Sequence, residues 1–118
     1  MIRLVAALAI ALTALQMSAT ASWAAQLVYV QWDKCGYCLR FNREMAGAYA
    51  ASSAGRKFPL RWVDVLGGWP ADLKHVRRPS YTPVFILVEN GREIGRFDGY
   101  AGPQTFKRNL RSLLQKRR

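Results

Sequence analysis

Apolar residues in this 118-residue chain gather in short runs and in stripes at helical spacing. Short runs rich in β-branched and aromatic residues predict strands, and four segments fit this description: 26–32, 60–65, 84–88 and 93–97. The first is nearly continuous in apolar residues, as strands buried on both faces of a sheet are. Between the last two, Asn90-Gly91 supplies the positive-φ pair of a type I′ hairpin turn. These two strands should therefore run antiparallel.

Two longer segments show the spacing of an amphipathic helix. The first stripe consists of Phe41, Met45, Ala48, Tyr49 and Ser52. Gly55 is predicted to end this helix in the left-handed conformation, and a short helix is predicted at 71–76. The C-terminal helix should begin at Pro103, with a buried stripe made of Phe106, Leu110, Leu113 and Leu114. A strand, a helix of this length and another strand imply a right-handed parallel crossover, which predicts an α/β domain.

The first 24 residues have the organisation of a secretory signal peptide. Arg3 precedes an apolar run at 4–15 and a stretch of small residues, and that run is short for a membrane-spanning helix. We expect cleavage after Ala24, with cleavage after Ala21 or retention as a membrane anchor as the alternatives. The remainder, 25–118, is then a single exported domain with one modest core.

The chain is strongly basic. Its 18 Lys and Arg fall to 17 when Arg3 is removed with the signal peptide, which leaves a net charge of +10 against seven Asp and Glu. Aromatic residues do not alternate with the basic ones as they do in single-strand nucleic-acid binders. We therefore expect no nucleic-acid partner. A solvated basic face, an acidic protein partner and an anionic membrane surface are the remaining interpretations.

The only two cysteines, Cys35 and Cys38, lie where the first strand gives way to the first helix. A helix N-terminus favours a thiolate over a thiol, and cysteines in such Cys-X-X-Cys motifs have lowered pKa values. Two intervening residues let the sulfurs form or release a disulfide with little backbone movement. We predict an exposed nucleophile, Cys35, with Cys38 behind it as the resolving thiol. Lys34 adds a neighbouring cation that tunes the pKa of Cys35.

Two other interpretations of the cysteine pair are open. A purely structural disulfide between residues three apart closes a very small loop and stabilises the fold little. Half of a zinc site would need further ligands, and the chain offers only His75, which is predicted to be a solvated loop residue. We therefore expect neither a metal nor an organic cofactor.

Taken in order, these elements and the motif Cys35-Gly36-Tyr37-Cys38 resemble the thioredoxin superfamily in its compact form. Further markers are Thr82-Pro83 before the third strand, the Asn-Gly hairpin and the Gly99-Tyr100 loop. The resemblance covers the chain from residue 26 to the C-terminal helix. It implies a thioredoxin-like fold with a four-stranded mixed sheet, two parallel strands plus an antiparallel hairpin, flanked by helices. The implied strand order is 60–65, 26–32, 84–88 and 93–97.

The resemblance also implies the surroundings of the cysteines. Pro83 is expected to follow a cis peptide bond and to lie against them, with a trans proline that only starts a strand as the alternative. In the family, the backbone before this proline pairs with an extended client peptide. The implied client groove is lined by Tyr37, Tyr81, Thr82, Pro83, Gly99 and Tyr100.

Several residues depart from the pattern of thioredoxin proper and indicate which branch of the superfamily this chain resembles. Lys34 stands where thioredoxin proper has Trp, Gly36-Tyr37 replaces Gly-Pro, and Tyr29 takes the place of the buried aspartate that helps deprotonate the resolving thiol. Gly-Tyr is found in periplasmic disulfide isomerases, but we expect a monomer without their dimerisation domain. The run 82–96 is similar to small periplasmic thioredoxins encoded with bacterial sulfur-oxidation systems. That likeness implies a sulfur-carrier client and a membrane thiol-disulfide electron donor.

The sequence therefore predicts an exported thiol-disulfide oxidoreductase that reduces a protein disulfide or cysteine adduct through Cys35 and Cys38. One alternative reverses the direction and makes the protein a periplasmic disulfide oxidant or isomerase, since the direction depends on the reduction potential. Another alternative, from a different functional class, is a non-catalytic module that binds an acidic partner in a salt-sensitive way.

Overall fold

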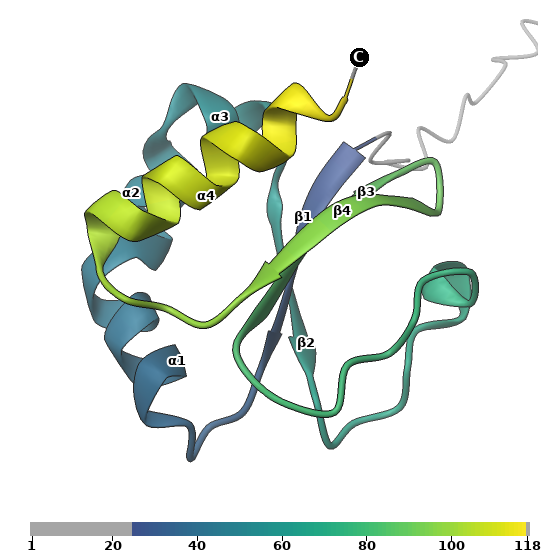
Figure 1. Ribbon diagram of the computed structural model, residues 1–118. Coiled ribbons are helices and arrows are strands. Elements are labelled where there is room, and N and C mark those ends of the chain that lie inside the picture. Colours follow the sequence, from purple (N-terminus) through teal and green to yellow (C-terminus); the bar gives the residue numbers. More distant parts are fainter. Residues whose placement is uncertain (1–24, 118) are drawn as a thin grey trace, which may run out of the picture.

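A four-stranded mixed sheet forms the centre of the computed structural model, which describes residues 25–117 (Figure 1). The predicted signal peptide lies outside the described residues. The strands are β1 (Ala25–Gln31), β2 (Leu60–Asp64), β3 (Val84–Glu89) and β4 (Arg92–Asp98), in the order β2-β1-β3-β4. β1 is parallel to β2 and antiparallel to β3, which pairs antiparallel with β4. The predicted fold class is confirmed, and the predicted strand ends differ from the observed ones by at most one residue.

Both faces of the central strands are buried. The helices gather over one face of the sheet, and the segment between β2 and β3, with the 3₁₀ turn η2 (Ala71–Leu73), covers the other (Figure 1). Alternate residues of β1 serve the two faces: Leu27 and Tyr29 join the core beneath the helices, whereas Val28 and Val30 pack with Leu73 on the opposite side. This double burial explains the nearly continuous apolar run of β1.

The helical segment after β1 is not one regular helix. It consists of α1 (Gly36–Phe41), the π-helical segment η1 (Asn42–Ala46), α2 (Gly47–Ala51) and, after a break at Ser52, α3 (Ser53–Lys57). The predicted stripe is wrong at Ala48, which is exposed, while Ala46 is buried instead. The wider i→i+5 turns of η1 rotate the following residues relative to a regular α-helix.

Gly55 lies inside α3 rather than ending a helix in the left-handed conformation, so that prediction is wrong. Ser52 is extended and caps α3 by accepting a hydrogen bond from the Gly55 N–H at 3.0 Å. A Cβ added to Gly55 would lie 1.8 Å from the backbone oxygen of Tyr49. The glycine therefore permits the close approach of α3 to the end of α2.

The helix predicted at 71–76 is present only as the 3₁₀ turn η2, whereas the chain from β3 onward follows the predictions closely. Asn90 and Gly91 have φ values of 53° and 76°, as a type I′ hairpin turn requires. α4 (Pro103–Gln115) begins with Pro103 and buries Phe106, Leu110 and Leu113 against the sheet. Along the part of the chain that the structure describes, every helix is too short or too polar to cross a bilayer.

Candidate active site

Cys35 and Cys38 form a disulfide at the junction of β1 and α1, with their Cα atoms 5.1 Å apart. Cys35 is the N-cap of α1, and its Sγ accepts a hydrogen bond from the Cys38 N–H at 3.1 Å. Cys38 is fully buried, and Cys35 is 9% exposed. The predicted order, with Cys38 behind Cys35, is present, but Cys35 is largely buried rather than exposed. Lys34 beside it is exposed.

This position gives the first sulfur a reactive character. The N–H groups of the first helical turn have no partners within the helix, and they carry the positive end of its dipole. A negative charge on Cys35 Sγ is stabilised there, and the Cys38 N–H already points at that atom. Because the thiolate is the attacking species, Cys35 is the sulfur suited to nucleophilic attack.

The Pro83 loop and the loop after β4 are joined next to α1. The Thr82–Pro83 peptide bond is cis. The Gly99 N–H donates a hydrogen bond to the Pro83 carbonyl at 2.9 Å. Gly99 has a φ of 79°, a conformation that favours glycine. The structure thus brings two of the predicted groove segments together.

A cavity of about 290 Å³ opens beside the motif. It is lined by Tyr37, Asp98, Gly99, Tyr100, Ala101, Thr105, Phe106 and Asn109. Three predicted groove residues therefore share this cavity, whereas Tyr81, Thr82 and Pro83 are not part of its lining. Tyr37 and Tyr81 expose 64% and 56% of their surface.

Tyr100 forms a wall of the cavity through a polar network that the sequence did not indicate. Its hydroxyl donates to Glu44 Oε2 at 2.7 Å, and Arg40 Nε donates to Glu44 Oε1 at 2.9 Å. Two hydrogen bonds, of which the one from Arg40 has the larger effect and the one from Tyr100 the smaller, hold the pKa of Glu44 below its usual range. Burial, and to a smaller extent the hydrogen bond to Glu44, raises the pKa of Tyr100 to about 12. The network ties the active-site helix to the loop after β4.

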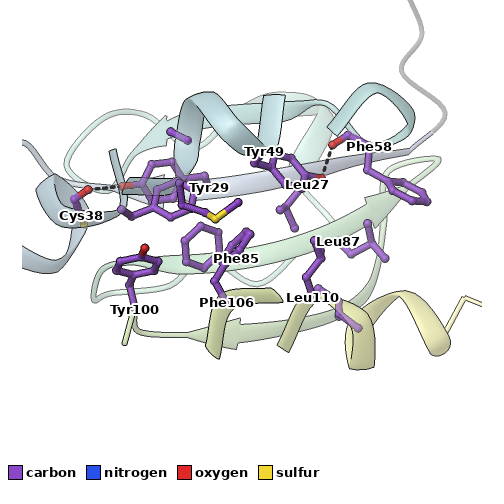
Figure 2. Close-up of a cluster of buried hydrophobic side chains, with 14 of the residues drawn as sticks. Leu27, Tyr29, Cys38, Tyr49, Phe58, Phe85, Leu87, Tyr100, Phe106 and Leu110 are labelled. Atoms are coloured by element: carbon purple, nitrogen blue, oxygen red, sulfur yellow. Dashed lines mark hydrogen bonds between the residues drawn. The ribbon is translucent and has the colours of Figure 1, made fainter. Parts of the chain in front are cut away.

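Tyr29 is a second functional candidate that sequence reasoning missed. Its side chain is fully buried, and its hydroxyl lies 3.3 Å from the Cys38 carbonyl oxygen (Figure 2). The same hydroxyl lies 2.9 Å from Asn42 Oδ1. Burial raises its pKa well above the ordinary value, so the hydroxyl keeps its proton. The available signal was a hydroxyl within an apolar strand, at the position of the family's buried aspartate.

The described residues contain no evident metal site. Among residues 25–117, no three His, Cys, Asp or Glu side chains cluster as metal ligands would. His75 is exposed in the segment that follows η2.

Solved structures show the same fold. The periplasmic thioredoxin SoxS from Paracoccus pantotrophus, in its reduced form, is 29% identical over 80% of this chain and 99% of its own, with a TM-score of 0.74. Trxlp from Edwardsiella tarda EIB202 is 32% identical over 76% of this chain and 84% of its own, with a TM-score of 0.59. Fasciola hepatica thioredoxin is 22% identical over 74% of this chain and 79% of its own, with a TM-score of 0.54. It shows the likeness of fold alone. No protein-family model and no curated protein matches the sequence.

The fold and the cysteine pair at the head of α1 define a thiol-disulfide oxidoreductase. Proteins of this kind act on disulfides of protein substrates by exchanging them with their own cysteine pair. The chain belongs to the thioredoxin superfamily.

Proposed function

We propose that this protein is exported to the periplasm and there reduces a disulfide or a cysteine adduct on a client protein. In this proposal, 1–24 is the signal peptide and 25–118 is the working thioredoxin-like domain. The charged, apolar and small-residue regions of the N-terminal segment support export. The likeness to a periplasmic thioredoxin supports the compartment. The single observation that carries the reductase chemistry is the disulfide pair with Cys35 at the N-cap of α1.

The proposed reaction is two successive thiol-disulfide exchanges. The Cys35 thiolate attacks one sulfur of the client disulfide, and the other client sulfur leaves as a thiolate and takes up a proton. Cys38 then loses its proton and attacks Cys35 Sγ, which releases the second client thiolate and leaves the Cys35–Cys38 disulfide. Two electrons pass to the client, and a membrane thiol-disulfide donor returns two electrons to the pair.

The proposed client groove crosses the cavity and the Pro83 loop. Tyr37, Gly99 and Tyr100 would contact client side chains from the cavity, since they line it. Tyr81, Thr82 and Pro83 would present an edge to an extended client backbone, as strand addition requires. Lys34 would favour the Cys35 thiolate through its charge.

A carrier protein of a bacterial sulfur-oxidation system is the client that we propose. Support comes from the similarity of 82–96 to small thioredoxins of such systems and from the likeness to SoxS. A cysteine of such a carrier that has entered a disulfide or an adduct is a substrate for the exchange described above. The protein would act as a monomer.

Two single substitutions test the proposed chemistry. Cys35→Ser should reduce insulin disulfide reduction to the uncatalysed rate, because the attacking sulfur is gone. Cys38→Ser should accumulate a mixed disulfide with the client, because the resolving sulfur is gone. The measurements are reduction kinetics with dithiothreitol as electron donor and non-reducing mass analysis.

The two variants control for each other, since each loses one sulfur at the same helix start. Full activity of Cys35→Ser would contradict the proposal. Salt-sensitive binding of an acidic partner that persists in the double serine variant, without reduction by the wild type, would instead indicate a binding module.

A further inference from the structure

The hydroxyl of Tyr29 reaches the backbone of the buried cysteine from the sheet below it. It lies 3.3 Å from the Cys38 carbonyl oxygen (Figure 2) and 2.9 Å from Asn42 Oδ1. Because the burial of Tyr29 keeps this hydroxyl protonated, it acts as a donor whose single proton is shared between the two acceptors, and it cannot take a proton from a thiol. Its part in the exchange reaction must therefore differ from that of a buried carboxylate.

Cys38 is restrained through both of its backbone polar groups. Its N–H donates to Cys35 Sγ at 3.1 Å, and its carbonyl accepts from Tyr29 and from the Asn42 N–H. The Asn42 N–H is shared between the Cys38 and Leu39 carbonyls, at the residue where α1 changes into the π-helical η1. The tyrosine hydroxyl is an additional donor to a carbonyl that also keeps its regular i→i+4 helical bond.

We propose that Tyr29, oriented by Asn42, is a positioning residue for the redox centre. By holding the Cys38 carbonyl, it keeps the Cys38 N–H directed at Cys35 Sγ and so favours the thiolate of Cys35. A hydrogen bond to a charged sulfur is stronger than one to a disulfide sulfur. The restraint therefore stabilises the reduced, ionised pair relative to the disulfide. This inference rests on the proposed redox role of Cys35 and Cys38.

Packing of the Tyr29 ring is a separate contribution. The ring centroid lies 4.7 Å from that of Phe41, 4.8 Å from that of Trp62 and 5.0 Å from that of Phe85. Tyr29→Phe keeps these aromatic contacts and removes only the hydroxyl. The substitution therefore separates positioning from core packing.

The test is the titration of Cys35 in reduced Tyr29→Phe, followed by the ultraviolet absorbance of the thiolate. The pKa of Cys35 should rise by about half a unit to one unit, as expected for the loss of one hydrogen bond. The equilibrium of the pair with glutathione should move about three- to tenfold toward the protein disulfide. Asn42→Ala should shift both quantities in the same direction, and the double variant should shift them by less than the sum.

The chain offers a matched control in Tyr49→Phe. Tyr49 is also buried, and its hydroxyl also donates to a backbone carbonyl nine residues along, that of Phe58, at 2.6 Å (Figure 2). This variant should lose stability without changing the Cys35 pKa or the glutathione equilibrium. Unchanged values in Tyr29→Phe, or equal shifts in Tyr49→Phe, would overturn the inference. If the wild type did not exchange with glutathione, the proposed function would fail, while the titration would still decide the role of Tyr29.

Discussion

Glu44 connects two parts of the chain that lie 56 residues apart in sequence. One carboxylate oxygen accepts from Arg40 on the active-site helix, and the other accepts from Tyr100 in the loop after β4. The guanidinium of Arg40 also lies 5.6 Å from the centre of the Tyr100 ring. One side chain thus holds a cavity wall against the helix that carries the cysteines.

The lowered pKa of Glu44 predicts how this link depends on pH. Because the pKa is lower in the folded state than in the unfolded state, the carboxylate contributes stability above its unfolded pKa. That contribution is lost as the pH falls through the folded value. Glu44→Gln should therefore be less stable than the wild type at pH 7, and the difference should shrink below about pH 4. Urea unfolding at several pH values measures it.

Asp33→Asn is a suitable comparison for Glu44→Gln, because it also neutralises one carboxylate and Asp33 is exposed. A stability loss in Glu44→Gln that stayed constant from pH 7 to pH 3 would contradict the role of the ionised carboxylate.

The local residue pattern predicted the cysteine chemistry but not its supporting contacts. Cys35 and Cys38 are recognisable because their spacing and their place at a helix start are local features. Tyr29 and Glu44 find their partners through the tertiary fold, and neither partnership has a spacing that can be recognised along the chain. The sequence therefore identified the reacting atoms and missed the side chains that hold them.

The junction between α2 and α3 is the tightest point of the helical layer. The hydroxyl of Ser52 caps α3 through the Gly55 N–H, and a Cβ on Gly55 would overlap the backbone oxygen of Tyr49 at 1.8 Å. Gly55→Ala should therefore destabilise the protein by about 1–3 kcal/mol, since backbone on both sides must shift. Urea unfolding measures the loss.

Gly47→Ala is the matched control for Gly55→Ala. Gly47 lies at the start of α2, and a Cβ added there would have nothing within 4 Å. This variant should gain about 0.5–1 kcal/mol from the higher helix propensity of alanine. Equal stabilities of the two variants would contradict the prediction, because they would show that the overlap at residue 55 is removed by small shifts that do not lower the free energy of unfolding.

Regular elements were predictable where one periodicity persists along the segment. β1 and α4 keep a constant pattern over their whole length, so the ends of β1 and the start of α4 agree with the sequence within one residue, and of the predicted α4 stripe only Leu114 is partly rather than fully buried. The helical layer after β1 changes its turn type at Asn42 and breaks at Ser52. A prediction that assumed regular α-helical spacing throughout the segment therefore assigned Ala48 to the core in place of Ala46.

The complete fold brings the ends of several elements to one site. α1 begins there, the Pro83 loop enters β3, and the loop after β4 returns through the Gly99–Pro83 hydrogen bond (Figure 1). The element order predicted this convergence through the likeness to a known family. It did not predict the cavity, because Asp98, Thr105 and Asn109 enter the lining only when α4 packs on the sheet. Of the residues predicted for the groove, Tyr37, Gly99 and Tyr100 line this cavity, and their contact with a client stays a prediction.

The direction of electron flow is a property of the whole molecule, since it compares the folded disulfide with the folded dithiol. For the proposed reductase, the Cys35–Cys38 couple in the processed chain should have a reduction potential near or below about −230 mV. Against a partner couple at about −180 mV, that value favours reduction of the partner roughly fifty-fold. Equilibration of the processed protein with defined thiol buffers measures the potential. The double serine variant, which has no Cys35–Cys38 couple, gives the background signal of this measurement. A value between about −120 and −190 mV would contradict the reductase and assign the protein to the oxidants or isomerases, because electrons would then flow from client thiols to this pair.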